Sequence, residues 1–418
     1  MGERERKAKK LRKGGDRERG FFQGLKDESF LERRFPMTKR VAIIGVGTTG
    51  FRATTPDLSY RELTYEAATK AYMEAGIEPK DVDAFVSTAE DFFEGYSIAD
   101  EYAPDQLGAV LKPVYTVPGD FIHSLASAYM MIMSGVAEIS VVQGMSKASN
   151  MLTLSEMVGF AMDPIYNRPL KEDPVFIAGM EMMRYLHETG TTRRQCAQVV
   201  VKNKRNALNN PNAGHGALID VDYVLNSPMV SYPLTEMDIS PHSDGAVVMV
   251  LAAEETARAL SDKPIWIRGI GWCSDTPVLE SWDWAEATYT RLAAQQAYKM
   301  AGIRYPRKEI DFVELNDEFS YKELQHLEAL MLCKKGEAGP MTEAGATEIE
   351  GELPVNPSGG CLGVGNLFEL NGGQKVLDVV LQLRGEAGKN QLKDVTTGLA
   401  HSWRGIPTAT GAVVILSN

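Results

Sequence analysis

The sequence predicts an α/β protein whose two halves arose by duplication. A helix-like run that ends in glycine and leads into a β-rich run occurs twice in the chain. Each copy is preceded by an apolar, strand-like segment that ends in a glycine turn. At 418 residues the chain is long enough for two compact halves. Its 44% hydrophobic and 24% charged residues are typical of a globular protein.

The repeated unit spans residues 63–89 and residues 288–317. Its alanine and tyrosine positions recur at helical spacing, and each run ends in a glycine where a left-handed cap favours that residue. A proline follows shortly after and stops the helix. The matched residues are Ala67 with Ala293, Ala71 with Ala297, Tyr72 with Tyr298, Ala75 with Ala301, Gly76 with Gly302, and Ile77 with Ile303. Six matches in register favour duplication over chance similarity between alanine-rich helices.

Strands are predicted before each repeat, at 41–47 (VAIIGVG) and 265–271 (IWIRGIG). Strand, helix and strand in succession form a βαβ unit, whose strands run parallel. Gly45, Gly47 and Gly50 also fit the dinucleotide-binding pattern GxGxxG. That site needs the helix to begin on these glycines. Here Pro56 intervenes and the helix is expected to begin only after a cap at Asp57 or Ser59, so the pattern argues against a nucleotide site.

Charge and cysteine content exclude several function classes. The net charge of -12 argues against nucleic acid as a partner, because phosphate binding requires a basic face. The four cysteines, at 196, 273, 333 and 361, contain no CxxC pair, which argues against a zinc site and a disulfide framework. A reducing, cytoplasmic setting follows. No apolar run approaches the roughly 18 residues of a membrane span.

Residues 1–36 form a separate segment, dense in charges of both signs and poor in apolar groups. Such a segment cannot bury enough surface to offset its ordering entropy, so we expect disorder. A basic arm for an anionic partner is the less favoured alternative. Met37 stands just before the first predicted strand and is a candidate translation start.

Glycine-rich and polar clusters lie in five segments: 116–149, 240–255, 313–333, 353–376 and 398–416. They contain SDGA before a buried strand (from Ser243), ELNDEF (from Glu314) and NPSGG before a glycine turn (from Asn356). In order and content these motifs resemble the thiolase superfamily, especially its archaeal and lipid-transfer-protein branch. The resemblance covers the chain from about Lys39 to the C-terminus.

The resemblance implies a five-layer αβαβα fold with mixed sheets, formed by halves at 37–258 and 259–418. It implies a coenzyme A thioester as substrate, no permanently bound cofactor and a homodimer. A small zinc-ribbon/OB-fold partner of the DUF35 type is also implied, since thiolases of this branch often work with one. No metal site is expected.

Thiolases use a cysteine nucleophile, a histidine in a GHP turn and a second cysteine, and this sequence departs from that pattern. The nucleophile position falls at Pro118 and the GHP histidine at Asn366, while the second cysteine falls around Ser402 and Trp403. Asparagine donates hydrogen bonds but carries no proton at neutral pH. The asparagine of the ELNDEF motif, Asn316, is kept. Steroid side-chain aldolases of the same branch have also lost the cysteine.

We therefore predict carbon–carbon bond cleavage or formation at the β-carbon of an acyl-CoA by a retro-aldol-type route. The aldolases carry tyrosines at the positions of Asn316 and Asn366, so the match to them is incomplete. The alternatives are an acyltransferase that uses Cys361 or a partner's cysteine, and a non-catalytic scaffold of a heteromeric complex that binds coenzyme A. The expected catalytic residues are Asn316 and Asn366 as oxyanion donors, His401 as proton handler, and Cys361.

Residues expected to contact substrate or coenzyme A are Pro118, Gly119, His123, Ser243, Asp244, Gly245, Gly360 and Gly365. Structural roles compete with some of these assignments. A buried Cys361 packs like a small hydrophobic residue. Asp317 and Glu318 flank Asn316; either could be the base for a β-hydroxyl, but a carboxylate held by backbone N–H groups is the commoner outcome.

Overall fold

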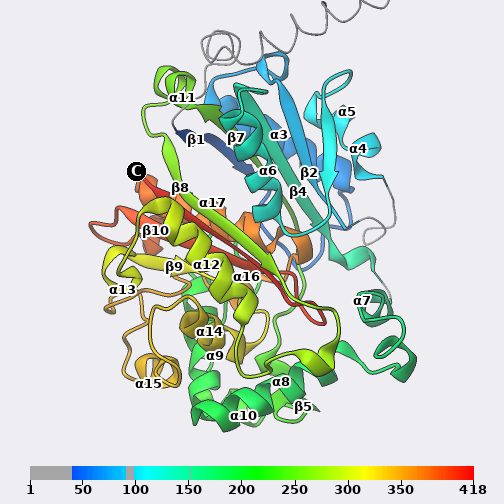
Figure 1. The fold of residues 1–418 in the computed structure, drawn as a ribbon, viewed down its shortest axis with the longest axis vertical. Coiled ribbons are helices and arrows are strands. Elements are labelled where there is room, and N and C mark those ends of the chain that lie inside the picture. Colours follow the sequence, from blue (N-terminus) through cyan, green and yellow to red (C-terminus); the bar gives the residue numbers. More distant parts are fainter. Residues whose placement is uncertain (1–39, 91–97, 152) are drawn as a thin grey trace, which may run out of the picture.

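The structure, a computed structural model, describes residues 40–90, 98–151 and 153–418. The extension predicted at 1–36 lies outside the described residues. One large mixed sheet organises the fold (Figure 1). Its strands, in chain order, are β1 (Val41–Thr48), β2 (Ala84–Thr88), β3 (Val114–Val117), β4 (Ile139–Lys147), β7 (Asp244–Ala253), β8 (Ile265–Ser274), β9 (Phe312–Glu314), β10 (Thr397–Trp403) and β11 (Thr410–Ser417).

The strand order repeats between the halves, which supports the predicted duplication. In the sheet the order is β3-β2-β4-β7-β1-β8-β11-β10-β9, so β2-β4-β7-β1 mirrors β9-β10-β11-β8. In both sets the first pair is parallel and the next two pairs are antiparallel. β1 and β2 run parallel as predicted, but β7 and β4 lie between them. A bridge from Val313 to Val355 takes the place of β3 in the second half.

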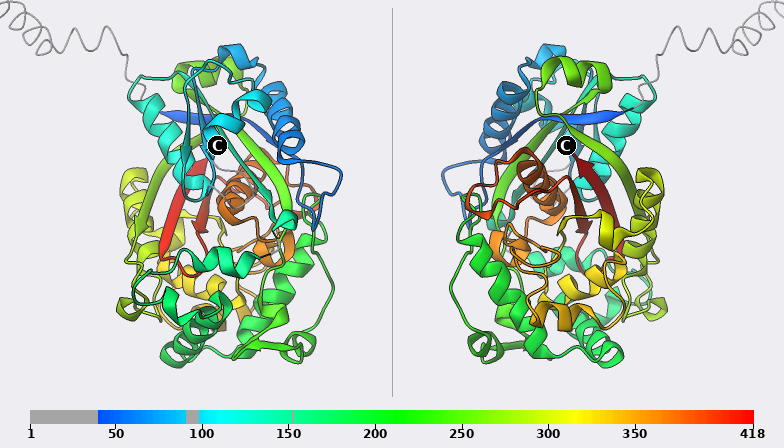
Figure 2. Two further views of the ribbon diagram at one scale, coloured as in Figure 1. Left: turned by 90° about the vertical axis from the view of Figure 1, so that its right-hand side faces the viewer. Right: turned by 90° about the vertical axis from the view of Figure 1, so that its left-hand side faces the viewer.

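Five layers of helix and strand are visible when the molecule is turned (Figure 2). Helix α3 (Tyr60–Ala75) covers the outer face of the first half, and α12 (Thr288–Ala301) covers that of the second. Helices α6 (Phe121–Met133) and α17 (Asn371–Arg384) pack between the halves in a shared core. The two half-sheets are joined, because β1 pairs with β8 at Ala42–Trp266 and Ile43–Ile265. The predicted boundary at 258/259 lies within α11 (Glu254–Leu260) and stays a prediction.

Paired glycines bring each outer helix unusually close to its strand. A Cβ on Gly47 would lie 2.0 Å from the carbonyl oxygen of Ala67, and one on Gly271 would lie 2.3 Å from that of Ala293. Gly45 has the same relation to Ala71 at 2.4 Å. The GxG pattern therefore serves helix–strand packing. That helix begins at the predicted cap Ser59, which forms a capping box with Glu62.

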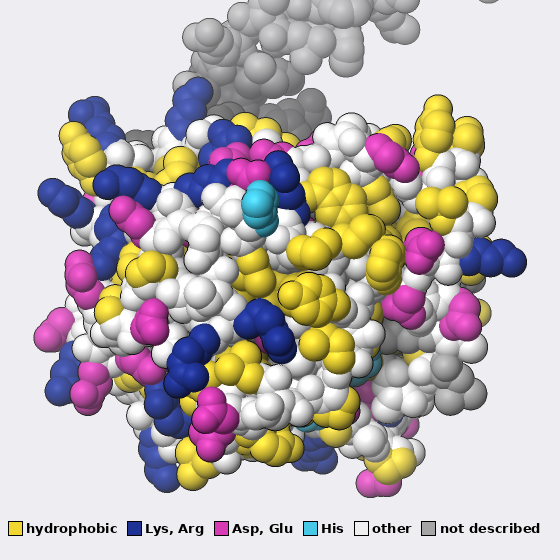
Figure 3. All heavy atoms as spheres, turned by 90° about the horizontal axis from the view of Figure 1, so that it is seen from below, with side chains coloured by type: hydrophobic (Ala, Val, Ile, Leu, Met, Phe, Trp, Pro, Cys, Tyr) yellow, Lys and Arg dark blue, Asp and Glu magenta, His cyan; other side chains and the backbone are white. Residues whose placement is uncertain are grey.

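An inserted region in the first half completes the fold. It contains α7 (Leu154–Gly159), α8 (Pro174–Thr189), α9 (Arg193–Ala207), α10 (Val221–Leu225) and the hairpin β5–β6 (Met229–Ser231, Leu234–Thr235). Seen from below, the molecule shows hydrophobic side chains on this face (Figure 3). Exposed residues of α8 and the hairpin include Phe176, Met183, Met229, Val230 and Tyr232.

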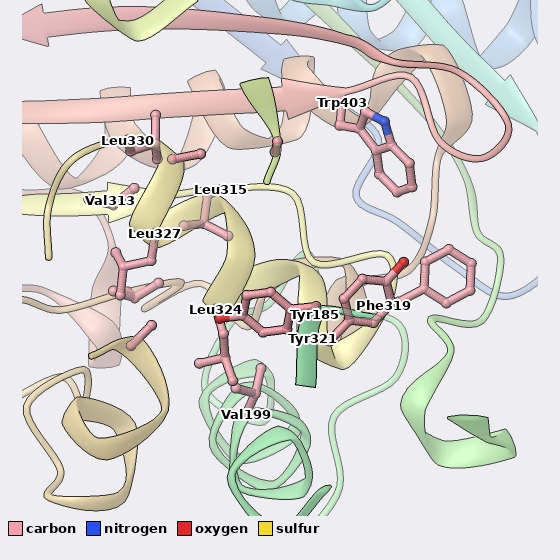
Figure 4. Packing of buried hydrophobic residues seen from close by; sticks show 14 of the residues in the cluster. Tyr185, Val199, Val313, Leu315, Phe319, Tyr321, Leu324, Leu327, Leu330 and Trp403 are labelled. Carbon is pink, nitrogen blue, oxygen red and sulfur yellow. The ribbon is translucent and has the colours of Figure 1, made fainter. Parts of the chain in front are cut away.

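The insertion packs on the second half through a large apolar core. Tyr185 of α8 and Val199 of α9 meet Tyr321 and Leu324 of α14 (Ser320–Ala329) in this core (Figure 4). Across residues 40–90, 98–151 and 153–418, no helix has the length and apolar character needed to cross a membrane. The same described ranges hold no group of three or more His, Cys, Asp or Glu side chains suited to a metal ion.

Candidate active site

A cavity of about 630 Å³ lies between the insertion and the second half. Its wall is formed by α7, the start of α8, and the segments 239–242, 318–319, 366–371 and 404–408. Most of the wall is apolar. The residues that make it so include Met157, Val158, Phe160, Phe319, Phe368 and Ile406. A cavity of this size and character suits a bulky apolar group, with a few polar side chains to orient it.

Glu318 is one of the carboxylates that line this cavity, and it follows the carboxyl end of β9 by four residues. Its backbone is fixed on both sides: its N–H donates to Asn316 Oδ1 at 3.0 Å, and its carbonyl accepts from Ser240 N at 2.8 Å. Burial raises the pKa of Glu318 to about 7, although the charge of Lys322 and a hydrogen bond from Asn366 oppose the rise. Glu318 therefore changes protonation state near neutral pH.

Asn366, on the glycine turn, lies in the same wall, and its role as an oxyanion donor stays a prediction. Its Oδ1 accepts from Phe368 N at 3.0 Å and from Asn371 Nδ2 at 2.8 Å. Because the acceptor side of the amide is engaged, the Nδ2 side is left to donate, and Glu318 takes one of those hydrogen bonds. His242 stacks on Phe368 with ring centroids 4.9 Å apart.

Cys361 lies outside the cavity wall, fully buried in α16 (Gly360–Val364). Asp317 accepts hydrogen bonds from the N–H groups of Cys361 and Leu362 and from Asn203 Nδ2. Burial raises the pKa of the Cys361 thiol to about 12, which leaves it protonated at neutral pH. A protonated thiol is a poor nucleophile. Asp317 thus takes the structural role that competed with catalysis, whereas Glu318 faces the cavity.

Asn316 and His401 sit behind the wall, in contact with each other and with the core. Asn316 Nδ2 donates to Trp403 O at 3.2 Å, and its backbone N–H points to His401 Nδ1 at 3.5 Å. His401 Nε2 lies 3.0 Å from Thr290 Oγ1. Burial and the charges of nearby lysines lower the pKa of His401 to about 3, so it is neutral at physiological pH. Its predicted role in proton transfer stays a prediction that this setting does not favour.

The segment before α6 contains a carboxylate, Asp120, two residues after Pro118, the position of the thiolase nucleophile. Asp120 caps α6, with Oδ1 accepting from Ile122 N at 2.9 Å and Oδ2 from Gly372 N at 2.8 Å. Burial raises its pKa to about 6 despite these hydrogen bonds. Pro118, Gly119 and His123 lie beside it and do not line the cavity. This segment ties the two inner helices together.

Family models match most of the chain. Residues 41–221 match the thiolase N-terminal domain, and residues 272–418 match the thiolase C-terminal domain-like model. An acetyl-CoA acetyltransferase of Methanothermobacter thermautotrophicus is 34% identical over 385 residues, which cover 90% of this chain and 99% of that one. This chain belongs to the thiolase family.

Two further similarities lie among aldolases. A steroid side-chain-cleaving aldolase of Thermomonospora curvata is 30% identical over 383 residues, which cover 88% of this chain and 96% of that one. A solved structure described as an Ltp2-ChsH2(DUF35) aldolase superposes with a TM-score of 0.78 at 27% identity, covering 91% of this chain and 98% of that one. The fold predicted from the thiolase resemblance is confirmed, since thiolases also superpose on the chain. The family's enzymes act on acyl-CoA carbon–carbon bonds, as predicted.

Ser243 and Asp244, which are predicted to contact coenzyme A in this thiolase-family chain, are engaged by other side chains of the same chain. Burial alone would raise the pKa of Asp244, but hydrogen bonds from Lys147, Ser149 and Thr55 outweigh it and lower the pKa. Ser243 Oγ lies 3.1 Å from His215 Nε2. The coenzyme A contacts assigned to this segment stay predictions.

Three glycines near Ser243 and Asp317 let the backbone pass close to other side chains. A Cβ on Gly365 would lie 2.0 Å from Ser243 Oγ, and one on Gly360 would lie 2.2 Å from Asp317 Oδ2. A Cβ on Gly245 would lie 2.6 Å from the ring of Phe51. These three positions therefore admit only glycine where the backbone runs now, and any role toward coenzyme A stays a prediction.

The wall also contains Glu90, Ser240 and Arg404, which were not singled out from the sequence. Arg404 is ion-paired with Glu90 there, and the buried Ser240 Oγ has no hydrogen-bond partner. The signal that could have identified Arg404 is its position directly before Gly405 in the glycine-containing C-terminal segment. Sequence reasoning considered Glu318 only as one of two carboxylates beside Asn316 and favoured a structural role for both.

Proposed function

We propose that the chain breaks or forms the bond at the β-carbon of an acyl-CoA thioester without an acyl-enzyme intermediate. The observation that carries this proposal is the lack of an accessible thiolate at the cavity. Proline occupies the nucleophile position, and all four cysteines, which are among the described residues, lie away from the wall. The similarity to steroid side-chain-cleaving aldolases supports a retro-aldol-type route.

In this route a β-hydroxyacyl-CoA loses its hydroxyl proton, a carbonyl forms at the β-carbon, and the bond between the α- and β-carbons breaks. The electron pair passes to the α-carbon and is delocalised onto the thioester oxygen as an enolate. Asn366 donates a hydrogen bond to that oxygen. Donors aimed at a developing oxyanion are typically the largest electrostatic contribution to such reactions. Asn316 is a positioning residue, because its Oδ1 accepts a hydrogen bond from the backbone N–H of Glu318 and so holds that residue in place.

The apolar wall favours a bulky acyl substituent over a short one. Phe160, Phe319 and Phe368 offer ring surfaces around a volume of about 630 Å³, within the usual range for small-molecule sites. We propose that coenzyme A enters only as part of the substrate and that no cofactor is held permanently.

For assembly we propose a homodimer and a small DUF35-type partner in the cytoplasm. The partner proposal is supported by the similar aldolase whose description includes DUF35. Four unpaired cysteines are in keeping with a reducing compartment.

The test is a turnover screen by mass spectrometry with the full chain, alone and co-expressed with a DUF35-type protein from its genomic neighbourhood. β-Hydroxyacyl-CoA thioesters with apolar β-substituents should be cleaved to a shorter acyl-CoA and a carbonyl compound. Thiolytic cleavage of β-ketoacyl-CoA instead would support the acyltransferase alternative, which the similarity to acetyl-CoA acetyltransferase favours. Binding without turnover of either class would support the scaffold.

A further inference from the structure

Glu318 is held in the cavity wall by contacts from several elements. Besides the two backbone hydrogen bonds at residue 318, the loop after β10 passes close to the carboxylate, since a Cβ added to Gly405 would lie 2.8 Å from Oε2. Phe319 follows with a bridge to Ile239, and Ser320 donates to Asp238 at 2.6 Å. The carboxylate is therefore fixed at the end of the cavity where Asn366 also lies.

Ionisable groups surround Glu318 on every side. They are Lys322 and Tyr321 on α14, Tyr289 on α12, Cys361 on α16, and His242, Glu369 and Arg404 in the wall. Lys322 pairs with Glu181 at 2.7 Å, and Arg404 pairs with Glu90, so both cations are already partly neutralised. Burial dominates over their influence, which is why the pKa of Glu318 rises to about 7.

Several other proton carriers near the site are engaged by neighbouring groups, and Glu369 is the remaining carboxylate of the wall. His401 faces Thr290 behind the wall, and the pKa of His242 is lowered by burial and by His215. Among the wall carboxylates, Glu90 is paired with Arg404, and Asp173 caps α8 by accepting from Val175 N at 2.7 Å.

We propose that Glu318 is the general acid–base residue of the carbon–carbon step, an inference that rests on the proposed function. Its carboxylate takes the proton of the β-hydroxyl while the C–O bond becomes C=O and the bond between the α- and β-carbons breaks. The resulting carboxylic acid returns that proton to the α-carbon of the enolate. The product is a shorter acyl-CoA and a carbonyl compound, and Glu318 is again ionised. Protons and electrons balance without any co-reactant.

The second half of this cycle is testable without the natural substrate. In reverse, Glu318 removes an α-proton from an acyl-CoA product, so the full chain should exchange the α-protons of propionyl-CoA for deuterium in D₂O. The expected loss in Glu318→Gln is about 100- to 10,000-fold in exchange rate, the usual contribution of a positioned acid or base. The exchange rate of the natural chain should rise with pH through about 7, because only the ionised carboxylate accepts a proton.

Two variants keep the test sharp. Glu318→Asp retains an ionisable group and should keep a pH-dependent but slower exchange. Glu350→Gln, an exposed change far from the wall, should leave the rate unchanged. Propionyl-CoA binding by calorimetry should survive in Glu318→Gln, which separates lost chemistry from lost binding.

The outcomes distinguish the two proposals. Exchange by the natural chain that persists in Glu318→Gln, or that is lost in Glu369→Gln instead, would overturn the role of Glu318 and leave the proposed function standing. No exchange by the natural chain, despite bound propionyl-CoA, would overturn the enolate chemistry of the proposed function itself.

Discussion

The two halves of the molecule agree closely in their outer layers and differ in their inner ones. In both, paired glycines let an alanine-lined helix contact a strand backbone, and a helix tyrosine donates to a carbonyl at the C-terminal end of a neighbouring helix. Tyr72 donates to Leu107 O and Tyr298 to Leu330 O, each at 2.8 Å. The helices end at Gly76 and Gly302, both left-handed.

The inner helix starts have diverged. In the first half Asp120 caps its own helix, α6, and also holds Gly372 of the other half. The second half has no counterpart to this cap, because Leu370, the N-cap residue of α17, makes no side-chain cap hydrogen bond. The second half supplies Glu318 and Asn366 to the cavity wall, and the insertion in the first half supplies Met157, Val158 and Phe160. The two halves have therefore kept the glycines and alanines that close helix–strand packing requires, whereas the inner segments that line the cavity have diverged.

The largest expected effect in this comparison tests whether Asn366, from the second half, takes part in catalysis. Asn366→Ala removes a donor to the thioester oxygen and should slow propionyl-CoA exchange by about 100- to 1,000-fold. The Michaelis constant should change less than the maximal rate, since the hydrogen bond strengthens as charge develops. Asn226→Ala, which changes an exposed asparagine on the far side of the insertion, serves as the matched control. An unchanged rate in Asn366→Ala would remove this residue from the site.

The next effect tests the agreement of the outer layers. Gly47→Ala and Gly271→Ala each force a Cβ against a helix carbonyl, and each should lower the free energy of unfolding by about 3 kcal/mol, the upper range for overpacking. Denaturant titration measures both. Gly159→Ala, where an added Cβ meets nothing within 4 Å, should change stability little. Unequal losses at residues 47 and 271 would show that the halves are less alike than their geometry indicates.

A smaller effect tests the same agreement at the tyrosines. Tyr72→Phe and Tyr298→Phe each remove one hydrogen bond and leave a buried carbonyl unpaired, which costs about 1 kcal/mol. Tyr65→Phe, on the exposed side of α3, is the control. If either buried variant matched this control, the hydrogen bond at that position would contribute nothing measurable.

Sequence reasoning succeeded where local rules decide the structure. Periodicity and glycine caps located α3 and α12, and the late cap at Ser59 excluded a nucleotide loop correctly. Sequence reasoning also singled out Asn366, which lines the cavity. It could not separate Asp317 from Glu318, because neighbouring residues in a strand-end loop point in different directions that tertiary packing sets. It could not foresee that His401 lies behind the wall, because that depends on packing against Thr290 of α12, more than 100 residues earlier in the chain. For Cys361 it weighed a catalytic role against a buried structural one, and the structure shows the thiol fully buried.

The central claim is that this thiolase-family chain works without a covalent acyl-enzyme. Intact-mass spectrometry after incubation with acetyl-CoA or propionyl-CoA tests it most directly. We expect the mass of the chain to stay unchanged, because Pro118 offers no nucleophile and the thiol of Cys361 is buried and protonated. A stoichiometric acyl adduct that disappears in Cys361→Ser would contradict the account and establish the acyltransferase in its place.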